Sequence, residues 1–186
     1  LHRRRHSFPT RRSSDLELER AIAITIQLRG DDDLDVGIAR IDLGFALLDA
    51  GRRSEASDAF RQAQAILAAT VGPTHSLNDM VLGGRCRVEN ERGRYDVALA
   101  LCSEALDRPE TRSGSPVTKG MLQLQLARAL RGLGDRDRAR KLALAARRRV
   151  DRASPGTNPR MTSDIDAWLE QAWRTTGAHP REGSSP

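Results

Sequence analysis

The chain has 186 residues, of which 38% are hydrophobic and only 3% aromatic, and its formal net charge is +6. Because aromatic and β-branched residues fill the faces of sandwiches and barrels, this shortage of aromatic residues argues against an all-β fold. Alanine, leucine and arginine dominate instead, which favours closely packed helices, so the predicted fold class is all-α. No apolar run approaches the ~20 residues that cross a bilayer, and no membrane segment is predicted.

Residues 1–16 (LHRRRHSFPTRRSSDL) hold much of the positive charge, with five arginines against one aspartate. Residues 7–15 (SFPTRRSSD) resemble the translation of a widely used sequencing adapter. We therefore expect residues 1–16 to be non-native or disordered, and the chain to be a C-terminal fragment of a larger bacterial protein. The alternative is a basic arm that grips phosphates. Without this segment the chain has 26 basic and 24 acidic residues, so most of the net positive charge comes from the segment. Because the segment is expected to be non-native, its charge is left out of the functional argument.

The next segments carry a helical pattern. Residues 17–30, which include most of the run LELERAIAITIQL (residues 16–28), are predicted to be the second helix of a repeat whose first helix is missing. Asp31–Asp33 then precede a helix that carries Val36–Leu48, and aspartates in that position favour a helix cap. Asp31–Asp35 could in principle ligate a hard cation, but the EF-hand spacing is absent, so a solvated cap is the preferred interpretation.

A pattern of about forty residues then recurs. GRRSEA begins at Gly51, GRYDVA at Gly93 and GDRDRA at Gly134. Each glycine is predicted to end one helix, because glycine tolerates the left-handed conformation of a C-cap. The next helix is predicted to be capped three residues later, at Ser54, Asp96 and Asp137.

Each copy has two further equivalent positions. Seven residues before the glycines stand Gly44, Cys86 and Ala127. Nine residues after them stand Phe60, Cys102 and Ala143. Helices joined by so short a turn lie antiparallel and approach closely only where their crossing residues are small. One such pair cannot bury its apolar face, so the pairs are expected to stack into a solenoid.

These positions resemble the signature of the tetratricopeptide-repeat (TPR) family. In the first copy the matching residues are Gly44, Gly51, Ala56, Phe60 and Ala63. The period is longer than the family's basic length and is similar to the variety found in kinesin light chains, as is the linker Val71-Gly-Pro-Thr-His75. The resemblance covers about residues 17–150, with repeats at about 33–70, 74–108 and 116–150. It implies an α-α superhelix that binds other proteins.

The second copy departs from the pattern, and the chain then ends in one more helix. Arg85 and Glu89 stand where the pattern has leucine or an aromatic residue, which predicts a loosely packed helix or a different pairing; loose packing is preferred.

Residues 160–176 place apolar residues at i, i+3, i+4, i+7 and i+8, which predicts a capping helix for the stack. Residues 177–186 are predicted to be a disordered tail. Trp168 and Trp173 are five residues apart, so packing is a better explanation for them than a ligand cage.

The sequence offers little for catalysis. No HExxH, GxSxG or GxxxxGK[ST] motif is present, so no enzyme activity, cofactor or metal is predicted. Cys86 and Cys102 lie at apolar helical positions without a CxxC motif, so buried free thiols are preferred over a single disulfide. Free thiols suit a reducing cytoplasm, which is the predicted location.

The face lined by the first helix of each pair is the predicted peptide groove. In register with the family, its residues are Phe45, Asp49, Arg87, Asn90, Glu91, Arg128 and Arg131. Arginine recurs in register at 87 and 128, which favours an acidic segment or a chain's C-terminus as ligand. The alternative is a solvated helix face. The partner's identity and the oligomeric state are not predicted.

Two other functions stay open at this stage. The repeats could be the C-terminal, substrate-recruiting region of a larger signalling enzyme such as a bacterial Ser/Thr protein kinase. The basic run Arg136–Arg152 could meet nucleic-acid phosphates, but it contains no aromatic residue that would stack on bases, so this function ranks lowest.

Overall fold

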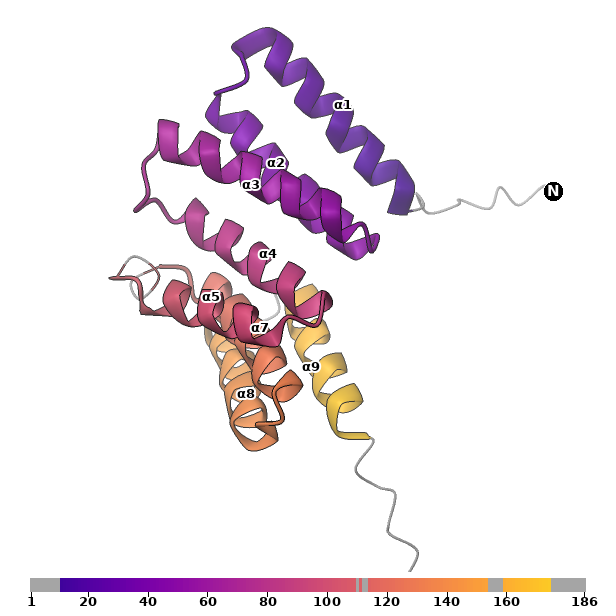
Figure 1. The fold of residues 1–186 in the computed structure, drawn as a ribbon, viewed down its shortest axis with the longest axis vertical. Helices are drawn as coiled ribbons and strands as arrows, with labels where there is room; N and C mark the ends of the chain where they lie inside the picture. The colour runs from indigo at the N-terminus through magenta and orange to yellow at the C-terminus, as the bar shows by residue number, and fades with distance from the viewer. Residues whose placement is uncertain (1–10, 110, 112–113, 154–158, 175–186) are drawn as a thin grey trace, which may run out of the picture.

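The computed structural model describes residues 11–109, 111, 114–153 and 159–174, and across these residues the chain forms a stack of eight helices (Figure 1). The predicted all-α class is confirmed. Successive helices pack as the pairs α2–α3, α4–α5 and α7–α8, with α1 and α9 at the two ends. The helices are α1 (Arg11–Arg29), α2 (Leu34–Asp49), α3 (Arg53–Thr70), α4 (Leu77–Glu91), α5 (Tyr95–Asp107), α7 (Pro116–Gly132), α8 (Arg136–Ala153) and α9 (Pro159–Arg174).

Helix α1 begins earlier than the sequence predicted. It starts at Arg11, so residues 11–16 form the first part of this helix. Residues 1–10 and the predicted tail, residues 177–186, lie outside the described part of the chain. At the other end of α1, Arg29 forms ion pairs with Asp33 and Asp35, which ties α1 to the start of α2.

The three predicted glycine turns are confirmed. Gly51, Gly93 and Gly134 have φ values of 79°, 75° and 92°, in the left-handed region that favours glycine. In each turn the N–H of the residue after the glycine donates to a carbonyl five residues earlier, at N···O distances of 2.8–2.9 Å. This bond satisfies a carbonyl that the helix end leaves free and reverses the chain for the next helix.

The predicted caps are correct at one helix and wrong at three. Asp33 caps α2, because its carboxylate accepts the N–H of Asp35 at 2.8 Å. Ser54, Asp96 and Asp137 do not cap, since their helices begin at residues 53, 95 and 136 and already include them. Each helix starts two residues after its glycine, which is two residues earlier than a cap at the third residue would place it. At α8 the cap is Asp135, whose carboxylate accepts the N–H of Arg138 at 3.2 Å.

The core of the N-terminal half is built around Phe60, which is fully buried. Its ring occupies the space that a side chain would need at two glycines: a Cβ on Gly44 would lie 2.7 Å from the ring, and one on Gly84 would lie closer still. Gly83 is similarly covered by the end of Met121. The predicted loose packing of α4 is therefore wrong, because paired glycines, and not large apolar residues, allow α4 to approach its neighbours closely.

The expected free thiols are also wrong. Cys86 of α4 and Cys102 of α5 form a disulfide, with their Cα atoms 5.8 Å apart and both side chains fully buried. These residues hold the positions of Gly44 and Phe60 in the preceding pair, where the two helices also touch. The disulfide therefore joins the second pair at its crossing point.

The C-terminal end of the stack is covered by α9. Ile165 is fully buried against Leu124 of α7 and against Ala146 and Val150 of α8. Its neighbours Met161, Trp168 and Leu169 are partly buried in the same cluster. The ion pair between Arg147 of α8 and Asp166 of α9, at 2.9 Å, fixes the register of the two helices.

Candidate functional site

The first helices of the pairs, α2, α4 and α7, contact one another in order and form one continuous face. We call this the first-helix face. Each predicted groove residue lies on one of these helices: Phe45 and Asp49 on α2, Arg87, Asn90 and Glu91 on α4, and Arg128 and Arg131 on α7. The glycine turns keep the helices in register, so the same helical position recurs from one pair to the next.

Arg87 is the centre of an ion-pair cluster. Its Nη2 donates to Asp49 of α2 at 2.8 Å, and its Nε donates to Glu91 of α4, also at 2.8 Å. Burial disfavours the charged guanidinium, but the hydrogen bonds to the two carboxylates outweigh burial, so the pKa of Arg87 lies above its ordinary value. The positive charge of Arg87 is therefore already balanced by side chains of the protein.

Arg128 is in a different electrostatic position. It is partly buried, and burial together with the nearby charge of Arg87 lowers its pKa, while Glu91 and Asp164 act in the opposite direction. Among the described residues we find neither a hydrogen bond nor an ion pair at 4.0 Å or less for Arg128, and its Nε is buried without a partner. Arg128 is thus a cation on this face whose donors are not taken up by neighbouring side chains.

Asn90 and Phe45 contribute to packing at the edge of the face. Asn90 is 8% exposed, and its amide donates to the carbonyl of Gln125 at 2.8 Å, which joins α4 to α7. Phe45 is half-buried, and its ring contacts that of Phe60 edge-on at 5.1 Å between centroids. Asn90 thus ties together the helices that carry Arg87 and Arg128, whereas the contact of Phe45 with Phe60 joins α2 to α3.

Arg131 lies where α7 meets α9. Its Nη2 donates to the carbonyl of Ala172 at 2.8 Å, and its guanidinium carbon lies 5.9 Å from the ring centroid of Trp173. Trp173 also meets Trp168 edge-on at 5.4 Å, a contact that the spacing of five residues did not suggest. A hollow of about 380 Å³ opens here, lined by Arg131, Trp168, Gln171 and Ala172.

Helix α9 supplies the residues that sequence reasoning missed. Asp164 acts on Arg128, and Trp168 and Gln171 line the hollow beside Arg131. The sequence predicted that this helix covers the end of the stack, but nothing in the pattern showed which of its polar residues would face α7. Gln125 was also missed, because a buried glutamine that offers its backbone carbonyl has no sequence signature.

Side chains that could hold a metal were searched for throughout the described residues, and no group of three or more histidines, cysteines, aspartates or glutamates is arranged to do so. The aspartates after α1 act as a cap and as ion-pair partners of Arg29. Of the helices in the described ranges, none combines the length and apolarity that a bilayer crossing requires.

Comparison with known proteins identifies the fold. No protein-family model matches the chain, and no curated protein does. Among solved structures, the chain is similar to the crystal structure of TPR-like repeats assigned to a kinesin light chain of Podosopora anserina. The TM-score is 0.54 at 19% sequence identity, and the match covers 78% of this chain and 70% of the other. The protein has the fold of a TPR-like helical repeat, with helices packed sequentially in antiparallel pairs.

Proposed function

We propose that this protein is a non-catalytic scaffold that binds an acidic segment of another protein along the first-helix face. TPR-like repeats generally act as protein-interaction scaffolds, which supports the general class. The more specific proposal, an acidic ligand, depends on the charges of α4 and α7. It assigns the main electrostatic contact to Arg128, with Arg87 and Arg131 on either side of it along the face.

The observation that carries the proposal is the unmatched charge of Arg128. A partly buried cation without a counter-ion is unfavourable, and a carboxylate from a ligand would relieve that cost. A guanidinium offers a planar fork of donors that matches a carboxylate, and the guanidinium of Arg128 is not paired with any described side chain. Arg87 is already bonded to two carboxylates, so it is expected to contribute less than Arg128 to the binding of an acidic ligand.

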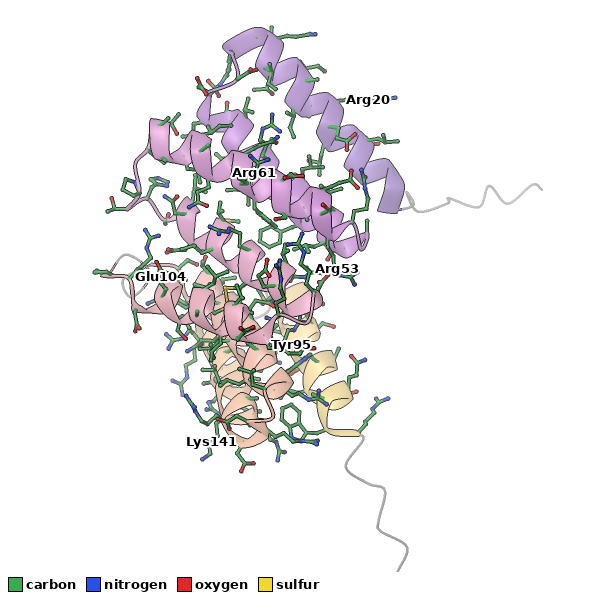
Figure 2. The ribbon with its side chains drawn as sticks, in the orientation of Figure 1. Arg20, Arg53, Arg61, Tyr95, Glu104 and Lys141 are labelled. Atoms are coloured by element: carbon green, nitrogen blue, oxygen red, sulfur yellow. A yellow bond between two sulfur atoms is a disulfide. The ribbon has the colours of Figure 1, made fainter. Side chains whose placement is uncertain are left out.

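The proposal is tested with displayed libraries of random peptides, followed by fluorescence anisotropy on the selected sequences. We expect enrichment of aspartate and glutamate, and we expect Arg128→Ala to weaken binding by about tenfold or more, the effect of losing one charge-assisted hydrogen bond. The matched control is Arg61→Ala on α3 (Figure 2), which removes the same charge from an exposed side chain. Equal loss in both variants, or selected peptides without acidic residues, would contradict the proposal.

The cytoplasmic location predicted from the sequence stays a prediction. The disulfide between Cys86 and Cys102 argues for a more oxidising compartment, because such bonds are rare where glutathione keeps thiols reduced. Trapping the thiols with an alkylating reagent at the moment of cell lysis distinguishes the two environments. A free thiol at both positions supports the cytoplasm, whereas protected cysteines support an oxidising compartment.

Attachment to a larger signalling enzyme, the second function predicted from the sequence, is compatible with the same binding face. In that case the first-helix face would recruit substrates or partners for a catalytic domain encoded upstream. Sequencing the source locus across the codons for residues 5–17 tests this directly. A reading frame that continues into a kinase domain would support it, and a start codon at this point would contradict it.

A further inference from the structure

The surface of α8 carries a hollow of about 430 Å³ that is lined by three arginines. These are Arg148, Arg149 and Arg152, and the remaining lining residues are Ala145, Ala153 and Pro116. Four of the helical lining positions, 145, 148, 149 and 152, are spaced i, i+3, i+4 and i+7, so they form one stripe along α8. The hollow includes none of the predicted groove residues, and none of its described lining residues is acidic.

The three charges of this stripe are not neutralised by the part of the protein that the structure describes. Arg148 and Arg152 are exposed, stand one turn apart, and form no ion pair with any described residue. Arg149 donates its Nε only to a neutral group, the amide oxygen of Gln123, at 3.2 Å. Arg147, the neighbour that points elsewhere, pairs with Asp151 and Asp166. Like charges at i, i+4 repel one another, so the stripe concentrates positive potential over the hollow.

The hollow also borders the beginning of α7, at Pro116. Pro116 is the first helical residue, and the side chain of the preceding Ser115 makes no capping hydrogen bond. The first N–H groups of a helix carry partial positive charge, which adds to the field of the arginines and has the same sign. Two other lining residues, Ala145 and Ala153, have small side chains, which leaves room for a compact ligand.

We propose that this hollow is a binding site for a multiply charged phosphate group, of the kind carried by a diphosphate or a phosphate ester. Guanidinium groups bind phosphate oxygens in pairs, and three of them on adjacent turns match a group that presents oxygens in several directions. Sequence-independent binding of single-stranded nucleic acid relies on aromatic side chains that stack on bases, and the described residues that line the hollow include no aromatic one. The lining therefore favours a compact phosphate over a polynucleotide.

The test uses the full chain and inorganic pyrophosphate, titrated in a calorimeter at constant ionic strength. The variant is Arg148→Ala with Arg152→Ala. Its matched control is Arg136→Ala with Arg140→Ala, which removes two exposed arginines at the same i, i+4 spacing from the same helix, outside the hollow. Alanine is the best helix former, so both variants should keep the fold, which circular dichroism checks.

We expect pyrophosphate to bind one site per chain, and the hollow variant to lose about tenfold or more in affinity while the control changes less than about twofold. Equal loss in both variants would overturn the proposal, because it would mean diffuse attraction to a basic helix. Absence of pyrophosphate binding to the unmodified chain would also overturn it. If single-stranded RNA binds and pyrophosphate does not displace it, the basic helix binds nucleic acid instead and the phosphate site is excluded.

Discussion

The first and third helix pairs cross at equivalent positions but fill the crossing with different residues. In α2–α3 a glycine, Gly44, faces the ring of Phe60. In α7–α8 the equivalent residues are Ala127 and Ala143, both fully buried. The second pair uses Cys86 and Cys102, sixteen residues apart in sequence, as are the other two pairs. The crossing therefore requires that the space between two helices be filled, and it does not require a particular residue type.

The two ends of the stack should respond differently to mutation for this reason. The N-terminal half depends on one large ring that reaches two helices, because Phe60 fills the space beside both Gly44 and Gly84. In the C-terminal half, the core is filled by several smaller residues of α7 and α8 and by Ile165 of α9. Tyr95 is a second ring of this type, placed at the start of α5 (Figure 2) over Gly132 of α7.

The largest expected effect is that of Phe60→Ala. Truncating a fully buried ring leaves a cavity between three helices, and such changes cost about 3–5 kcal/mol of unfolding free energy. The matched change in the third pair is Ala143→Gly, which should cost only about 1 kcal/mol through helix propensity. Urea unfolding followed by circular dichroism measures both. Similar losses would mean that the two crossings are packed in the same way after all.

The disulfide of the middle pair should have the next largest effect. Closing a loop of this length stabilises a protein by about 3 kcal/mol, so a reducing agent should lower the unfolding free energy by that amount. The double variant Cys86→Ala, Cys102→Ala copies the alanine pair of α7–α8 and should not respond to the reducing agent. Titration of the unfolded, non-reduced protein with a thiol reagent is the control. Two reactive thiols would contradict the disulfide.

Adjacent glycines in α4 provide a sharper comparison. Gly84→Ala should destabilise by about 1–3 kcal/mol, because the new methyl group would collide with the rigid, buried ring of Phe60. Gly83→Ala meets only the flexible end of Met121, so the higher helix propensity of alanine, about 1 kcal/mol, should offset most of the clash. Unfolding free energies of the two variants decide the point. Equal destabilisation would show that Met121 is held as rigidly as Phe60.

The smallest expected effects are those of the caps. Asp33→Ala at α2 and Asp135→Ala at α8 should each cost about 1 kcal/mol, since each carboxylate accepts a free N–H at its helix start. Ser54→Ala, where the sequence predicted a cap that the structure does not have, should change stability by less than about 0.5 kcal/mol. Thermal unfolding of the three variants gives the order. A larger effect at Ser54 would show that Ser54 caps α3, as the sequence predicted.

The parts of the fold that depend on local chemistry could be predicted from the sequence. The left-handed turns at Gly51, Gly93 and Gly134 need a residue without a Cβ, and the pattern of glycines shows this directly. The exact start of each helix could not be predicted. At α8, for example, Asp135 and Asp137 are both acceptable caps, and the turn geometry selects Asp135. The disulfide was within reach, since Cys86 and Cys102 occupy positions that the repeat places opposite each other.

The candidate site could be predicted less completely. The repeat register brings Asp49, Arg87 and Glu91 onto one face, and the structure shows the ion pairs that join them. Register alone did not show that Arg87 is neutralised while Arg128 is not, because that difference depends on side-chain geometry. The contribution of α9 depends on how a helix docks after a connection that has no repeat pattern. The sequence pattern therefore did not show that Asp164 would act on Arg128 or that Trp168 would lie beside Arg131.

The unequal filling of the crossings has a consequence for the shape of the stack. The distance between two packed helices depends on the side chains between them, so a glycine with a ring, a cysteine pair and an alanine pair set different spacings along one chain. A superhelix built in this way does not have a constant pitch. An extended ligand that follows the first helices would meet a different curvature at each end, and we expect it to bind in one chain direction only.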